Sequence, residues 1–142
     1  MFKGKGGKKI VLIEDSEFSQ IQIKEALENF PVELIILSSA EEALSLLDRG
    51  INIDLMLIDI GLPKMNGVEF LEKVNKEYKQ YEDTLKIAVT AHVMKTEMDN
   101  YIGKGFYRII SKPFRLQQFR DVIASTLKVS NQKVLSKNIL NV

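Results

Sequence analysis

Short apolar runs recur along the chain at a spacing typical of strands that alternate with helices. The runs are continuous, without the apolar–polar alternation of a half-exposed strand, and this pattern is typical of strands buried on both faces of a parallel sheet. We expect five strands, at residues 10–13, 32–37, 55–58, 85–89 and 109–110.

Helical periodicity fills the segments between these runs. Apolar residues three, four and seven positions apart lie on one face of a helix. Such stripes begin at Ile23, Ala40, Gly67, Met94 and Leu116. The stripe that contains Met94 and Met98 is the weakest, and we interpret these methionines as packing residues.

Helix start signals support the same order of elements. Ser39 with Glu42 forms a capping box, and Asn66 with Glu69 resembles one. Right-handed crossovers would then place helices on both faces of the sheet. The pattern predicts an α/β fold, a doubly wound (βα)5 unit around a five-stranded parallel sheet.

Length and composition set the domain organisation. The 142 residues suit one domain at 9–128, preceded by a flexible basic leader at 1–8 and followed by a tail or the start of a linker at 129–142. A net charge of +1 argues against general affinity for nucleic acid or for an anionic membrane. The chain has no cysteine, which excludes disulfides and thiolate metal sites and suits the cytoplasm. No apolar run reaches the length of a membrane span.

Polar residues follow four of the five predicted strands. They are Glu14 and Asp15 after the first, Asp59 after the third, Thr90 after the fourth, and Lys112 after the fifth. The carboxyl ends of parallel strands meet at one edge of the sheet, where open α/β folds bind ligands. The sequence therefore predicts three carboxylates, a hydroxyl and an ammonium group in one crevice.

This combination of groups suits phosphoryl transfer. Three neighbouring carboxylates repel one another unless a cation joins them, and their hard oxygens suit Mg²⁺. The lysine would pair with a phosphate. A carboxylate can itself be the nucleophile, so Asp59, at the end of a buried strand, is the candidate for an aspartyl phosphate.

Each residue taken alone has a simpler interpretation. Glu14 and Asp15 could be an acidic pair at a helix start, Thr90 an ordinary strand residue, and Lys112 part of a turn. Asp54, at the beginning of a strand, is interpreted as a solvated start signal and rejected as the acceptor. What favours the functional interpretation is that these residues fall together at the strand ends.

Four stretches carry a resemblance to a known family: "VLIEDS", "DLMLIDIGLPKMNG", "VTAH" and "SKPF". With them the chain resembles the receiver domain of two-component response regulators, especially the single-domain form typified by the chemotaxis regulator. The resemblance covers about residues 8–128 and implies a flavodoxin-like fold with strand order 2-1-3-4-5.

The resemblance also implies a metal site and a phosphoacceptor. Asp59 would accept the phosphoryl group. Mg²⁺ would be held by Glu14, Asp15, Asp59 and the backbone carbonyl of Gly61.

The remaining motif residues would handle the phosphoryl group. Lys112 would pair with it, Thr90 would bind it and move toward it, and Ala91 would leave room for that movement. Pro113 would follow a cis peptide bond. The family usually has an aromatic residue three positions before this Lys-Pro pair, and here Ile109 takes that place, which puts the conformational readout in question.

The resemblance implies a signalling phosphoacceptor that catalyses only its own phosphorylation and dephosphorylation. Its donor would be a histidine kinase or a histidine phosphotransfer protein docked around Phe18, Gln20, Ile21 and the loop after Pro113. A downstream protein would bind the face of the fourth helix, fifth strand and fifth helix. We expect no direct contact with nucleic acid or membrane, and a cytoplasmic location.

Other functions remain open. A Mg²⁺-dependent aspartyl-phosphate hydrolase would need a general acid two residues after Asp59, where the sequence has Gly61, and room for a specificity cap. A receiver cut from a larger regulator or hybrid kinase, and a degenerate receiver acting as a binding scaffold, are further alternatives. A dinucleotide site is disfavoured because "GKGGKK" precedes the first strand, whereas the fingerprint follows it.

Overall fold

The computed structural model describes residues 7–91 and 94–140. Most of the predicted basic leader, residues 1–6, and His92, which we interpreted as a surface residue at the rim of the crevice, lie outside the described residues.

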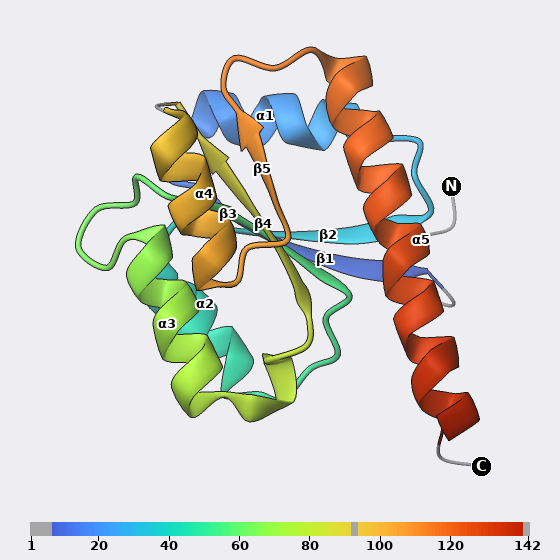
Figure 1. Ribbon diagram of the computed structural model, residues 1–142. Coiled ribbons are helices and arrows are strands. Elements are labelled where there is room, and N and C mark those ends of the chain that lie inside the picture. Colours follow the sequence, from blue (N-terminus) through green and yellow to red (C-terminus); the bar gives the residue numbers. More distant parts are fainter. Residues whose placement is uncertain (1–6, 92–93, 141–142) are drawn as a thin grey trace.

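Five parallel strands form one sheet in the order β2-β1-β3-β4-β5, as predicted (Figure 1). The strands are β1 (Lys8–Ile13), β2 (Val32–Leu37), β3 (Leu55–Asp59), β4 (Leu85–Thr90) and β5 (Arg108–Ser111). The doubly wound α/β fold is therefore confirmed, and the expected strand positions are right to within two residues.

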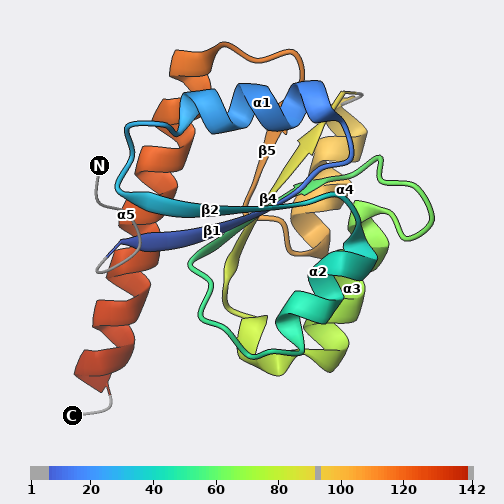
Figure 2. The same cartoon turned by 180° about the vertical axis from the view of Figure 1, so that it is seen from behind.

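Helices cover both faces of this sheet. They are α1 (Glu17–Ala26), α2 (Ala40–Leu47), α3 (Gly67–Glu77), α4 (Lys95–Lys104) and α5 (Leu116–Leu140), with a short 3-10 helix η1 (Lys79–Tyr81) before β4. In Figures 1 and 2, α1 and α5 lie on one side of the sheet and α2, α3 and α4 on the other. This is the arrangement that right-handed crossovers impose on a sheet whose strand order reverses at β1.

The core consists of two apolar layers, one on each face of the sheet. In β1, Val11 and Ile13 face the layer under α2 and α3, whereas Ile10 and Leu12 face the layer under α1 and α5. All four side chains are at most 1% exposed. Successive side chains of a strand point to opposite faces. Burial of both faces thus explains the continuous apolar runs of the sequence.

Side-chain caps fix the starts of α2 and α3. The Ser39 hydroxyl accepts a hydrogen bond from the Glu42 N–H at 3.1 Å, but the Glu42 carboxylate accepts from Ser38, one residue before the expected partner. Asn66 and Glu69 form the complete reciprocal box, at 2.9 and 3.0 Å. The α3 cap matters for function because α3 follows the loop that leaves Asp59.

Two helices differ from what the sequence patterns suggested. The last helix, α5, continues to Leu140, through most of the segment that we assigned to a tail or the start of a linker, and beyond the edge of the sheet in Figure 1. Residues 129–140 contain neither Gly nor Pro, so nothing in the sequence stops the helix after its apolar stripe ends. The predicted packing role of Met94, which directly precedes α4, and of Met98 within it is wrong, because these side chains are 69% and 38% exposed. Tyr101 is the residue of that helix which packs on the core.

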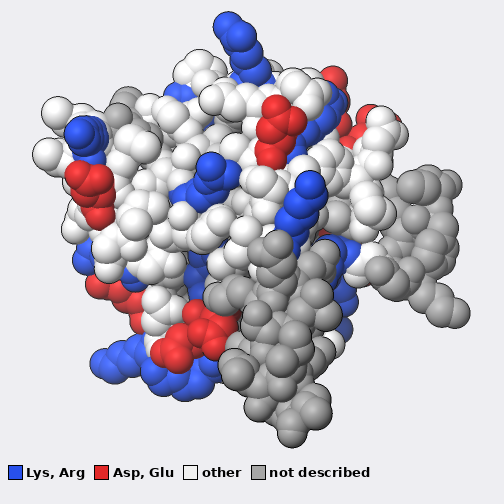
Figure 3. Space-filling model, turned by 45° about the vertical axis from the view of Figure 1, so that its right-hand side comes forward, with Lys and Arg blue, Asp and Glu red and all other residues white. Residues whose placement is uncertain are grey.

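The molecular surface carries charges of both signs. On the face in Figure 3, blue and red side chains are separated by broad uncharged areas. Among the described residues, no helix is both long and apolar enough to cross a bilayer.

Candidate functional site at the carboxyl edge of the sheet

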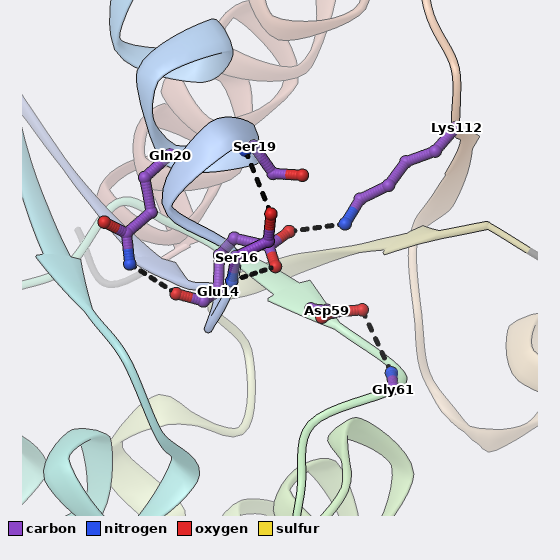
Figure 4. A network of polar contacts seen from close by, with 7 residues as sticks. All are labelled: Glu14, Ser16, Ser19, Gln20, Asp59, Gly61 and Lys112. Carbon is purple, nitrogen blue, oxygen red and sulfur yellow. Dashed lines mark hydrogen bonds and ion pairs between the residues drawn. The ribbon is translucent and has the colours of Figure 1, made fainter.

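Three carboxylates meet at the carboxyl edge of β1 and β3. Glu14 follows β1 and is fully buried, Asp59 is the last residue of β3 and is 8% exposed, and Asp15 faces solvent. Each offers one oxygen, and these oxygens lie within 4.8 Å of one another. The predicted acidic crevice therefore exists, and Figure 4 shows Glu14 and Asp59 from close by.

Backbone and side-chain contacts hold Glu14 in place. Its own N–H donates to the carbonyl of Leu37 at 2.9 Å, which extends the β1–β2 ladder by one residue. Its carboxylate accepts from the Ser16 N–H at 3.0 Å, and its carbonyl accepts from the Gln20 side chain at 2.6 Å. A buried carboxylate needs such donors because burial removes its hydration.

The first turn of α1 lies beside the acids. Ser16 caps this helix by accepting from the Ser19 N–H at 3.3 Å. The unpaired N–H groups at a helix start carry partial positive charge and favour nearby anions. The amino end of α1 thus offsets part of the negative charge that the sequence concentrates here.

Two glycines position Asp59. The N–H of Gly61 donates to one carboxylate oxygen of Asp59 at 3.0 Å. Gly67 begins α3 so close to the end of β3 that an added Cβ would lie 2.5 Å from the Asp59 carbonyl oxygen and 2.8 Å from the Ile60 Cα. Sequence reasoning counted Gly67 only as a helix position, although its place directly after the capping residue Asn66 was a usable signal for a close approach.

The environment of Asp59 favours its protonated form. The pKa of this carboxyl is raised from 3.8 to about 6, and burial is the largest cause. The Gly61 N–H and the Lys112 ammonium act in the opposite direction, whereas the Glu14 carboxylate raises the pKa further. Asp59 is therefore a buried carboxyl whose surroundings stabilise its charged form poorly, a property typical of residues that bind a cation or react.

Lys112 reaches the acids from the end of β5. Its ammonium lies 2.6 Å from a carboxylate oxygen of Glu14, as Figure 4 shows. The sequence had suggested that this lysine would pair with a phosphate and would not neutralise an acid. In the structure it does neutralise one, because a fully buried carboxylate such as Glu14 strongly attracts the nearest cation.

Thr90 lies at the same edge. It ends β4, is 6% exposed, and its carbonyl accepts from the Lys112 N–H at 2.8 Å. The Lys112–Pro113 peptide bond is cis, which confirms the implication of the resemblance.

The donor set fits a hard divalent cation. Glu14, Asp15 and Asp59 supply carboxylate oxygens within 4.8 Å of one another, and such hard oxygen ligands are those that Mg²⁺ prefers. Gly61 follows Asp59 by two residues, so its backbone lies beside these oxygens.

Charged residues at the opposite edge behave differently. Asp54, expected to be a solvated start signal, accepts from the Lys9 N–H at 2.7 Å and lies 3.7 Å from the Lys8 ammonium. Its side chain is 29% exposed, so it is partly solvated as expected but also paired, and its position before β3 agrees with its rejection as a site residue. Sequence reasoning also missed Lys86, a buried lysine within β4, whose signal was a lone charge inside an apolar run.

Comparison with known proteins adds family information. The family model described as "Response regulator receiver domain" matches residues 10–124. The polar-differentiation response regulator DivK of Brucella ovis is 33% identical over 120 residues, which cover 84% of this chain and 96% of DivK.

Longer relatives match only in part. The sensor histidine kinase CheAY of Helicobacter pylori is 29% identical over 125 residues, 87% of this chain. The chain spans only 15% of CheAY and 13% of the aerobic respiration control sensor protein ArcB of Escherichia coli.

Solved structures agree on the fold. The signal receiver domain of a putative Luxo repressor protein from Vibrio parahaemolyticus has a TM-score of 0.82 and 25% identity, over 92% of this chain and 97% of that one. A CheY-like receiver domain protein from Methanospirillum hungatei has a TM-score of 0.78 and 27% identity, over 89% and 98%. With its sheet order, acidic crevice and family match together, this chain belongs to the response regulator receiver domains of two-component signal transduction.

Proposed function

We propose that the chain is a phosphorylation switch in which Asp59 accepts a phosphoryl group, in a Mg²⁺-dependent reaction, from a histidine kinase or a histidine phosphotransfer protein. The observation that carries the proposal is the acidic cluster, in which Asp59 lies within 4.8 Å of two further carboxylates at the end of a buried strand. Receiver domains are normally non-enzymatic phosphoacceptors in such signalling, and histidine kinases phosphorylate them.

The transfer is a displacement at phosphorus. A carboxylate oxygen of Asp59 forms the new bond to phosphorus as the bond between phosphorus and the donor's histidine nitrogen breaks. The nitrogen keeps the electron pair of the broken bond, and the product is an acyl phosphate on Asp59. Such a reaction depends mainly on placement of the groups and on neutralising the phosphoryl oxygens.

Residues of this chain supply both requirements. The Gly61 N–H and the close approach of Gly67 orient Asp59 at the strand end. Mg²⁺ held by Glu14, Asp15, Asp59 and the Gly61 carbonyl would neutralise part of the phosphoryl charge. Lys112 would exchange Glu14 for a phosphoryl oxygen, and the Thr90 hydroxyl would donate to another.

A hydrolase is less well supported. Such an enzyme needs a general acid near the nucleophile to protonate the leaving group. Two residues after Asp59 the chain has Gly61, which offers a backbone N–H and no titratable side chain. The chemistry thus favours a signalling switch over metabolic turnover.

Two surfaces would serve partners. Phe18 and Ile21, on α1 beside the acidic cluster, are 71% and 57% exposed and would contact the phosphodonor with Gln20 and the loop after Pro113. A downstream protein would bind the α4–β5–α5 face, where Met94, Ile102 and Tyr107 are exposed. Apolar side chains gathered on a surface are typical of contact sites.

Intact mass measurement tests the proposal. After incubation with Mg²⁺ and acetyl phosphate, the wild type should gain one phosphoryl group and Asp59→Asn none. Asp54→Asn, at the opposite end of β3, is the matched control and should be labelled like the wild type. Equal labelling of Asp59→Asn and wild type would refute the assignment.

A further inference from the structure

The strand β2 forms one edge of the sheet. Its sequence, VELIIL, carries one charge and no proline, and it pairs with β1 without a bulge over all six residues. Among the described residues no strand pairs with its other side. Long, regular, apolar edge strands are usually protected, because their unpaired backbone groups bind further strands.

The outward backbone groups belong to Leu34 and Ile36. Glu14 donates to the carbonyl of Leu37, so Leu37 directs its backbone groups toward β1. Successive residues of a strand direct these groups to opposite sides. Leu34 and Ile36 therefore present their N–H and C=O groups at the free edge.

A groove of about 600 Å³ runs along this edge between β2 and α1. Figure 2 shows α1 lying along the sheet above β2. Leu34 and Ile36 contribute apolar side chains from the strand. Ile21, Lys24 and Glu25 line the groove from α1, and Glu28 lines it from the turn that follows this helix. A groove between an edge strand and a helix suits an extended peptide, which adds a strand on one side and places alternate side chains toward the helix.

The charged side chains that line the groove are mostly acidic and favour a basic occupant. Glu25 at the end of α1 and Glu28 in the following turn outnumber Lys24, and Glu33 adds a third acid, which lies 3.9 Å from Lys9. If two copies of this chain paired through their β2 edges, the acidic side chains of one groove would lie near those of the other, which is unfavourable. A strand with basic side chains would be attracted.

We propose that the groove between α1 and β2 binds an extended, basic segment of a partner protein by strand addition to β2. The segment pairs with the backbone of Leu34 and Ile36, packs alternate apolar side chains against them and Ile21, and directs lysine or arginine toward Glu25 and Glu28. This binding needs no phosphorylation of Asp59 and goes beyond the proposed switch.

The test uses the full isotope-labelled chain and a capped hexapeptide of alternating lysine and valine. Amide resonances of Leu34 and Ile36 should shift during titration, with little change at Asp59. Two control peptides separate the contributions. A glutamate–valine hexapeptide should bind more weakly, and a lysine–valine peptide with N-methylated pairing amides should not bind.

Charge reversals on the protein sharpen the result. Glu28→Lys should weaken binding of the basic peptide about fivefold, the range of one to two exposed charge contacts. Glu41→Lys, a reversal at another exposed glutamate on α2, should leave it unchanged. Equal weakening by both variants, or binding of the N-methylated peptide as tight as that of its parent, would overturn the proposal.

Two further outcomes would assign the groove to another occupant and so overturn the proposal. Resonances of Leu34 and Ile36 that move with protein concentration, without peptide, would show pairing between two copies. Movement of the same resonances in a full chain with Lys3→Glu and Lys5→Glu would show that the chain's own leader occupies the groove.

Discussion

The two edges of the sheet use the same kinds of charged residue in opposite ways. At the amino edge, Asp54 has a backbone donor and a lysine, and the Lys86 ammonium donates to the carbonyl oxygens of Tyr81, Thr84 and Glu82 at 2.6, 2.8 and 3.2 Å. At the carboxyl edge, three carboxylates lie close together, and the Lys112 ammonium pairs with one of them, that of Glu14.

The difference separates stabilising charges from functional ones. A buried charge whose hydrogen bonds are complete holds its neighbours in place. A cluster with surplus negative charge costs stability, and the cost is recovered when a cation binds. The comparison predicts that substitutions at the amino edge affect folding, whereas those at the carboxyl edge affect ligand binding and chemistry.

The largest expected effect on stability is at Lys86. Lys86→Met keeps most of the side-chain volume but removes the donor for three carbonyl oxygens, so we expect a loss of about 3–4 kcal/mol in the free energy of unfolding. Urea denaturation would measure it. Lys104→Met, which removes an exposed pair with Glu72, is the control and should cost about 0.5 kcal/mol or less. Equal losses would show that the carbonyl contacts of Lys86 are unimportant.

Gly67 tests whether close packing positions the carboxyl edge. Gly67→Ala would force the end of β3 away from α3, with an expected loss of about 2–3 kcal/mol and slower labelling by acetyl phosphate. Gly103→Ala in α4 meets nothing within 4 Å and should stabilise by about 0.5–1 kcal/mol. If Gly67→Ala behaved like Gly103→Ala, the proximity of α3 to Asp59 would have no consequence.

The contribution of Asp59 to the free energy of unfolding should depend on pH. Because its pKa is about 6 in the folded chain and 3.8 is its ordinary value, the folded state binds the proton more tightly and loses stability as the pH rises between these values. Asp59→Asn without metal should therefore gain about 1–3 kcal/mol above pH 6, and the gain should vanish below about pH 4. Thermal unfolding in a chelator across this range would measure it, and a gain independent of pH would contradict the explanation.

Mg²⁺ binding should depend on acids at the carboxyl edge of the sheet and not on those at the amino edge. Asp15→Ala should weaken Mg²⁺ binding about tenfold, which is about 1.4 kcal/mol, because water replaces an anionic ligand poorly. Asp54→Ala should bind Mg²⁺ like the wild type. Calorimetric titration of both variants would decide, and indistinguishable affinities would remove Asp15 from the ligand set.

The smallest expected effect is at Ile109. This residue is half-buried against the layer that contains Phe106 and Ala88, and its branched side chain has few rotamers. A beryllofluoride phosphate mimic should shift the amides of Thr90 and residues 91–95 strongly and that of Ile109 weakly. Shifts of equal size, with a rotamer change at Ile109, would show that the readout passes through β5 without an aromatic residue.

Sequence patterns predicted more of the carboxyl edge than of the amino edge. Glu14, Asp59 and Thr90 each stand directly after an apolar run, so a parallel sheet alone brings them together. Asp54 and Lys86 gave weaker signals because their partners are backbone groups, which every residue possesses. No local pattern says which carbonyls a lysine will reach.

The sequence by itself determined the (βα)5 order, the position of the strands and the chemistry at their carboxyl ends. It did so because burial of both sheet faces imposes apolar runs, and because parallel strands end at one edge. Only the tertiary structure decided that Lys112 contacts Glu14, 98 positions away, that Gly67 contacts the end of β3, and that the methionines of α4 face solvent. These features depend on distances between segments remote in sequence, and such distances follow from how whole layers pack, which no stretch of residues encodes locally.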